Sequence, residues 1–142
     1  MKRLTLLFFV ALLHIAGNAS AQQPVERKGV VPTTRLEEAF SGHLTDLNGK
    51  YKFRVAEITF EPGAYIGEHQ HIGPGVRFVV SGELTSVLSG KTTIYKAGDY
   101  FYEPGNMIHT VSNKTRLPAV VIGFDILPAD WNGASLVPPK SQ

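Results

Sequence analysis

Three histidines in two short segments are the residues of this chain best suited to chemistry. His69 and His71 are two residues apart, and His109 follows a Pro-Gly-Asn turn later in the chain. In a strand, residues i and i+2 project from the same face, so His69 and His71 present two imidazoles that one metal ion can bridge. Imidazoles that converge from separate strands commonly hold first-row transition metals. The pattern predicts a metal site formed by His69, His71 and His109.

The elements that must position these histidines are short strands. Apolar and β-branched runs alternate with turns rich in Gly, Pro and Asn, a pattern typical of an all-β sandwich or barrel. The expected strands cover residues 52–60, 76–80, 84–88, 92–95, 100–102, 109–111 and 119–127. The first of them is expected to end at a Glu-Pro-Gly turn at residues 61–63.

One segment outside these runs has a helical pattern. Thr34 can cap a helix, and Glu37 stands three residues later, which is the spacing of a capping box. We therefore expect one or two helical turns over residues 34–40, within an N-terminal arm at 22–50. The barrel is expected at 51–127, followed by a tail at 128–142. The irregular arm and tail would run over the surface or take part in dimer contacts.

The N-terminus has the pattern of a secretory signal peptide. Lys2 and Arg3 precede an apolar run over residues 4–15, and Ala19-Ser20-Ala21 forms a small-residue cleavage site. The apolar run is shorter than the ~20 residues that span a bilayer. We expect cleavage after residue 21 and a secreted protein, periplasmic if the source is Gram-negative, with no stable membrane anchor afterwards. The alternative is an uncleaved N-terminal anchor.

Composition excludes several classes of function. The chain has 14 Lys and Arg against 12 Asp and Glu. Removal of Lys2 and Arg3 with the signal peptide would leave equal numbers of basic and acidic residues. No basic cluster follows, so nucleic-acid binding is not expected. The chain has no cysteine, which excludes disulfides, thiolate metal ligands and thiol nucleophiles. Stability must then come from the core or from oligomerisation, and we expect a homodimer.

The two histidine segments resemble the two motifs of the cupin superfamily, G-x5-H-x-H-x3,4-E-x6-G and G-x5-P-x-G-x2-H-x3-N. The matching residues are Gly63, His69, His71 and Gly82, then Gly98, Pro104, His109 and Asn113. The resemblance implies a single cupin (jelly-roll) β-barrel and a divalent transition metal, with Fe, Mn, Zn, Ni and Cu all open. It does not imply one reaction, because cupins include dioxygenases, isomerases, decarboxylases, sugar-binding regulators and storage proteins.

The chain departs from the cupin motifs at two positions. The glycine expected before His109 is Asn106, which tolerates positive φ better than other non-Gly residues. The expected metal-binding glutamate is Gly75, so the inferred site has three histidines plus water or substrate. Such a site keeps the positive charge of a divalent ion and favours a small anionic ligand. Either Glu57 or Glu103 is expected to support the ligands by hydrogen bonds.

Three other residues are predicted to bind substrate. If Gly75 faces the barrel interior, strand alternation makes Arg77 face it too. Its guanidinium would then bind a substrate carboxylate through two hydrogen bonds. The alternative is a bulge or edge strand that turns Arg77 to solvent. Tyr65 shares parity with His69, and Tyr102 lies in the second motif. Aromatic residues in a small barrel more often pack than bind ligands.

Three functions are consistent with this sequence. The first is a metal-dependent enzyme, with an oxygenase-type reaction on a small carboxylate or dicarbonyl. The second is a non-catalytic protein that binds a small ligand or a metal. The third is a purely structural barrel that acts through its dimer, with its histidines only hydrogen-bonded inside.

Overall fold

The computed structural model describes residues 24–139, and the predicted signal peptide lies outside these residues. The described chain is all-β, as predicted. Its strands are β1 (Arg27–Ala39), β2 (Tyr51–His71), β3 (Gly75–Ser81), β4 (Glu83–Leu88), β5 (Lys91–Lys96), β6 (Tyr100–Glu103), β7 (His109–Ser112), β8 (Ala119–Pro128) and β9 (Leu136–Val137). All seven predicted strand segments fall within strands of the structure.

Strand β2 organises the barrel because it belongs to two pairings in succession. Its first part pairs antiparallel with β8, from Tyr51 opposite Pro128 to Phe60 opposite Ala119. Its second part pairs with β7, with Tyr65 opposite Ser112. Between them, Gly63 has a φ of 74°. The turn predicted at residues 61–63 is therefore a bend within one long strand that passes from one half of the barrel to the other.

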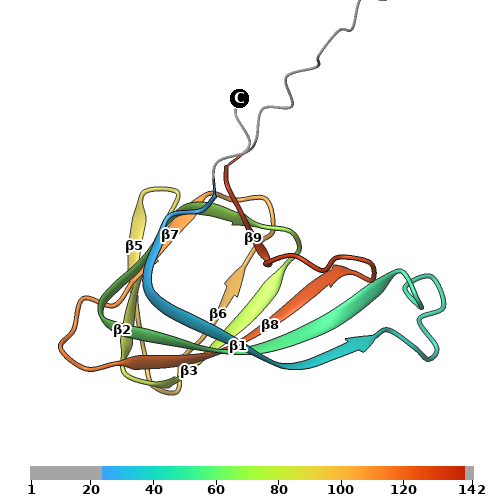
Figure 1. Cartoon of the computed structure of the whole chain (residues 1–142), viewed down its shortest axis with the longest axis horizontal. Helices are drawn as coiled ribbons and strands as arrows, with labels where there is room; N and C mark the ends of the chain where they lie inside the picture. The colour runs from blue at the N-terminus through green and yellow to red at the C-terminus, as the bar shows by residue number, and fades with distance from the viewer. Residues whose placement is uncertain (1–23, 140–142) are drawn as a thin grey trace, which may run out of the picture.

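The remaining strands extend this pairing into a nearly closed barrel (Figure 1). The order is β5-β4-β7-β2-β8-β3-β6, and β1 and β9 also pair with β2. Along β8, every second residue is buried and those between are only partly exposed or, at Phe124, exposed, as expected for a strand with one face in the core. Apolar side chains from β2, β3, β4, β7 and β8 fill the interior, including Phe60, Val79, Leu84, Val111 and Val121.

The helix predicted over residues 34–40 is wrong, because this segment forms the end of β1. Strand β1 pairs with β2 as far as Ala39 opposite Lys52. Instead of capping a helix, Glu37 forms ion pairs with Arg54 and Lys52 across the hairpin. Tertiary pairing therefore outweighs the local capping signal. Strands β1 and β9 both lie outside residues 51–127, so the predicted arm and tail contribute to the sheet.

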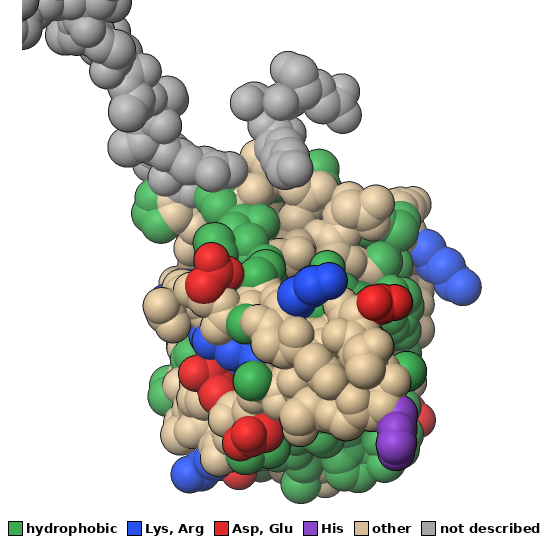
Figure 2. Space-filling model, turned by 90° about the vertical axis from the view of Figure 1, so that its right-hand side faces the viewer, with side chains coloured by type: hydrophobic (Ala, Val, Ile, Leu, Met, Phe, Trp, Pro, Cys, Tyr) green, Lys and Arg blue, Asp and Glu red, His purple; other side chains and the backbone are tan. Residues whose placement is uncertain are grey.

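The surface at the β1–β2 loop end carries charges of both signs. Acidic and basic side chains are interspersed there, with apolar groups between them (Figure 2). Within residues 24–139, no helix is long and apolar enough to cross a membrane.

The packed interior predicts a large difference between two leucine substitutions. Leu84 is 1% exposed and Leu117 is 71% exposed. Leu84→Ala should lower the free energy of unfolding by about 2–5 kcal/mol, because it leaves a cavity in the core. Leu117→Ala should change it by no more than about 0.5 kcal/mol. Urea unfolding followed by tryptophan fluorescence measures both, and equal effects would contradict this assignment of the core.

Candidate metal centre

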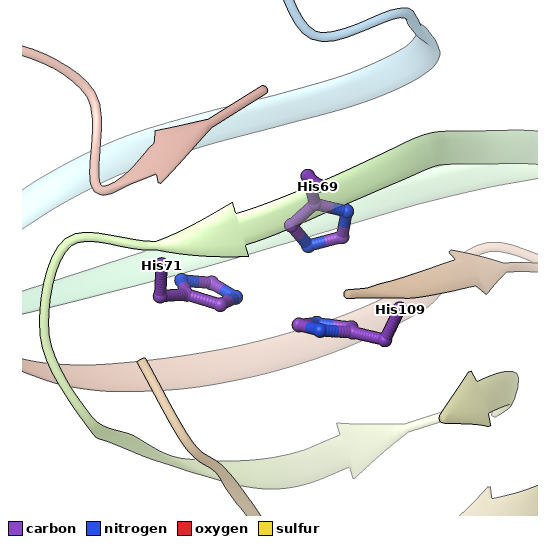
Figure 3. A group of neighbouring side chains, drawn as sticks. All are labelled: His69, His71 and His109. Carbon is purple, nitrogen blue, oxygen red and sulfur yellow. The ribbon is translucent and has the colours of Figure 1, made fainter. Parts of the chain in front are cut away.

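The three predicted histidines converge inside the barrel. His69 and His71 stand at the end of β2, and His109 begins β7 directly opposite His69 in the strand register. All three side chains are buried, and one nitrogen from each lies within 4.8 Å of the others. Their rings point toward one another from the two strands (Figure 3). The site is therefore compact enough for a single ion.

Backbone carbonyls orient two of the imidazoles. The Nδ1 atom of His69 lies 2.8 Å from the carbonyl oxygen of Gly67, and Nδ1 of His109 lies 3.2 Å from that of Met107. Carbonyl oxygens only accept hydrogen bonds, so each Nδ1 carries a proton and donates it. In a neutral ring, Nε2 then keeps its lone pair. Metal-binding histidines have this arrangement, in which the outer ring nitrogen is fixed by an acceptor.

The third imidazole contains an unpaired polar atom. Nε2 of His71 is buried and has no hydrogen-bond partner among the described residues, although Oε2 of Glu103 lies 3.1 Å away. Its Nδ1 lies 3.3 Å from Nη2 of Arg77. A buried polar atom without a partner is costly, and a metal ion at Nε2 would remove that cost. Such binding moves the ring proton to Nδ1, so Arg77, which only donates, would then release Nδ1. The donor set therefore fits a divalent transition metal.

A buried network of charges lies against the histidines. Nε of Arg77 donates to Oε2 of Glu103 at 2.7 Å, and its Nη2 donates to Oδ1 of Asp125 at the same distance. Oε1 of Glu103 lies 3.1 Å from Nε2 of His109. Arg77, Glu103 and Asp125 are each no more than 6% exposed. With neutral histidines and ionised carboxylates, the cluster carries one net negative charge.

Burial and neighbouring charges shift two pKa values in the cluster. Burial lowers the pKa of His69 to about 4, and repulsion from His109 acts in the same direction. Burial raises the pKa of Glu103, but the charge of Arg77 and the imidazoles of His109 and His71 outweigh it. They hold the pKa of Glu103 well below its usual value. A neutral His69 beside an ionised Glu103 suits a cation.

Two cavities meet at this cluster. One has a volume of about 90 Å³ and lies in the barrel interior, where apolar side chains such as Ile58, Ile66 and Leu84 join His69 and His71. The other, of about 150 Å³, is lined by more polar residues, including Lys91, beside His109. Glu103 lines both cavities. The histidines and Glu103 therefore lie where a small ligand could approach.

The structure places Arg77 in the interior, as one of the two predicted orientations requires. Gly75 and Arg77 are both buried on β3. The guanidinium of Arg77 pairs with Glu103 and Asp125, so it is not free to bind a substrate carboxylate as expected. The role of Arg77 in this structure is to hold Glu103.

The other predicted site residues divide between the cluster and the surface. Glu103 joins the histidines. Glu57 pairs instead with Arg35, and both side chains are well exposed. Tyr65 donates a hydrogen bond to Glu26, which raises the pKa of the phenol. Tyr102 is 61% exposed and lines the cavity beside His109. Its role in ligand binding stays a prediction.

Sequence reasoning did not single out Asp125, although a signal was present. Asp125 is the only charged residue in the apolar run of β8, and it shares parity with the inward-facing Val121 and Leu127. A charge at such a position requires a buried partner, which is Arg77.

The expected positive φ at Asn106 is absent, since Ser89 is the only non-Gly residue with positive φ in the described chain. Asn113 is a turn residue, as expected, and its amide donates to the carbonyls of Phe60 and Leu117.

Comparison with known proteins identifies relatives of this chain. The family described as Cupin domain matches residues 56–126. A cupin-like protein from Thermotoga maritima is 26% identical, with 76% of this chain and 75% of that chain covered and a TM-score of 0.55. No curated protein matches.

Two further solved structures share the fold at lower identity. A protein described as a predicted oxalate decarboxylase from Thermotoga maritima is 21% identical. The match covers 73% of this chain and 92% of that chain, with a TM-score of 0.55. The polyketide cyclase RemF from Streptomyces resistomycificus is 14% identical, with 82% of this chain and 75% of that chain covered and a TM-score of 0.59. At these identities the likeness concerns the fold alone.

The lowered pKa of His69 predicts how acid affects the metal-free protein. Below pH 6.5 the unfolded chain protonates His69, whereas the folded chain resists protonation down to about pH 4. The free energy of unfolding should therefore fall between pH 6.5 and pH 4, by at most about 3 kcal/mol from this residue. Glu103, with its lowered pKa, should add a further fall below pH 4.5.

Urea unfolding of chelator-treated protein at several pH values measures this dependence. Between pH 6.5 and about pH 5.5, well above the ordinary pKa of a glutamate, Glu103 stays ionised in both states, and His69→Gln should have a shallower slope than the unsubstituted protein. An identical slope in both proteins would show that His69 is not the residue responsible.

Proposed function

The chain belongs to the cupin family, and on that premise we propose that it is an exported cupin whose His69, His71 and His109 hold a divalent transition metal. The observation that carries this proposal is the convergence of three buried imidazoles, two of them with Nδ1 donating to backbone carbonyls. A bound ion would supply Lewis acidity and, if iron, manganese or copper, redox chemistry.

The interior cavity supports a small ligand for this site. Its volume is about 90 Å³ and its walls are mostly aliphatic, so it favours a compact molecule with an apolar portion. Arg27 also lines this cavity, and it forms no ion pair within residues 24–139. Since Arg77 is already paired, Arg27 is the better partner for an anionic group on such a ligand.

The reaction we propose is an oxygenase-type conversion of a small carboxylate or dicarbonyl. In this proposal the ligand's polar end meets the metal centre, and the aliphatic walls orient its apolar part and exclude water. The buried histidines keep the centre away from solvent, which strengthens electrostatic interactions inside it.

A second candidate function is non-catalytic binding of a small ligand or metal. One observation favours it: the described site offers no free general base. Glu103 is ion-paired with Arg77, and the hydroxyl of Tyr65 is bonded to Glu26. A binding protein needs only the cavity and the donor set, whereas an enzyme needs chemistry beyond them. Oxygen consumption with a panel of small organic acids distinguishes the two functions.

Export and a homodimer complete the proposal. The signal-peptide pattern of residues 1–21 supports export. The outer sheet face supports a dimer, because Val76, Tyr102 and Phe124 are exposed neighbours in the strand register. Contiguous apolar patches of this kind are typical of protein interfaces.

The central prediction of this proposal concerns metal content. Protein purified without chelator or added metal should carry about one transition-metal ion per chain. His69→Ala/His71→Ala should lose that ion, because it removes two of the three imidazoles. Elemental analysis by mass spectrometry measures both proteins.

His43→Ala is the matched control, since His43 is exposed and remote from the three histidines in sequence. It should retain the ion of the unsubstituted protein. A metal-free protein whose stability is unchanged by chelator would contradict the proposed function, as would a double variant that keeps its metal.

A further inference from the structure

We infer that Glu103 is a fourth ligand of the metal, supplying from β6 the carboxylate that Gly75 on β3 cannot supply. This inference rests on the proposed metal site and specifies its composition. It replaces a three-His centre with a three-His, one-carboxylate centre whose acidic ligand comes from a different strand.

The strand register places Glu103 next to the vacant position. Gly75 and Glu103 are directly opposite each other in the antiparallel pairing of β3 and β6. Directly opposite residues project from the same face of a sheet. Both residues are buried, so that face is the barrel interior. The side chain of Glu103 therefore enters the interior beside the place where one at position 75 would start.

The space at Gly75 is already filled. A Cβ atom there would lie 2.6 Å from Nη1 of Arg77, 2.6 Å from Oδ1 of Asp125 and 2.9 Å from the carbonyl oxygen of Phe124. These separations are too short for non-bonded atoms. The backbone carbonyl of Phe124, together with Arg77 and Asp125 in their present positions, leaves no room for a side chain at position 75. The same Arg77 holds the carboxylate of Glu103.

The carboxylate lies close to two of the three imidazoles. Its Oε1 is 3.1 Å from Nε2 of His109, and its Oε2 is 3.1 Å from Nε2 of His71. Metal–nitrogen and metal–oxygen bonds of about 2.0–2.2 Å, set at right angles, separate two ligand atoms by about 3 Å. The observed spacing, which is also that of a direct hydrogen bond, is compatible with neighbouring ligands on one ion.

The hydrogen-bond chemistry of His109 also calls for a cation here. Its Nδ1 faces the carbonyl of Met107 and its Nε2 faces Glu103, and both of those partners accept hydrogen bonds. A neutral imidazole has only one proton to donate. A metal ion between Nε2 and the carboxylate would satisfy both atoms while Nδ1 donates to Met107. A divalent ion would also change the cluster's net charge from −1 to +1.

The inference changes what the site can accept. A carboxylate ligand lowers the positive charge of the centre and takes one position that a three-His site would leave open. A ligand would then have fewer positions available, and a simple anion would bind less strongly than at a three-His ion.

Titration with Co²⁺, followed by its visible absorption, tests this inference. Compared with the unsubstituted protein, Glu103→Gln should bind Co²⁺ more weakly by more than ~10-fold. It should also shift the Co²⁺ absorption bands and bind azide more tightly, because a charge and a coordination position are freed. Glu57→Gln is the matched control, since Glu57 is partly exposed and paired with Arg35, and it should behave as the unsubstituted protein.

Unchanged absorption bands and azide affinity in Glu103→Gln would overturn the inference, even if Co²⁺ binding weakened, because a supporting hydrogen bond alone would give that result. If Glu103→Gln does not fold, Glu103→Asp retains the charge beside Arg77 but shortens the side chain. It should shift the Co²⁺ absorption bands, because the shorter side chain withdraws the carboxylate from the ion, and azide should bind less tightly than to Glu103→Gln. Failure of the unsubstituted protein to bind Co²⁺ would overturn the proposed function itself. Normal binding that is independent of Glu103 would overturn only this inference.

Discussion

The buried contact between Arg77 and two carboxylates is the interaction on which the rest of the site depends. Arg77 joins β3 to Glu103 on β6 and to Asp125 on β8, at 2.7 Å in each case. Removing one partner would leave a charge buried without compensation, which typically costs about 3–5 kcal/mol. The contact therefore fixes three strands together and holds a carboxylate against the histidines. The same side chains therefore contribute to the stability of the fold and to the shape of the proposed metal centre.

This contact explains why position 75 is a glycine. The cupin motif has a glutamate there, but in this structure the side chains of Arg77 and Asp125 fill the space beside Gly75. The absence of a carboxylate at Gly75 and the presence of one at Glu103, directly opposite, are thus linked through Arg77. Its cost is that Arg77, which would otherwise suit an anionic ligand, is committed to the protein.

Much of this structure follows from the sequence because strand periodicity and motif spacing are local signals. The i, i+2 spacing of His69 and His71 indicated a shared face, and their convergence with His109 was predicted. The helix at residues 34–40 was wrong because Glu37 pairs across a hairpin that no local pattern reveals. The orientation of Arg77 and the role of Asp125 depend on register between strands distant in sequence, and one sequence does not fix that register.

The central claim is that His69, His71 and His109 together bind one metal ion. Anomalous X-ray diffraction from crystals of the natively purified protein, recorded at the absorption edge of the ion found, tests it most directly. The account predicts one anomalous peak inside the barrel, about 2.0–2.2 Å from a ring nitrogen of each histidine. A barrel interior without such a peak would contradict it.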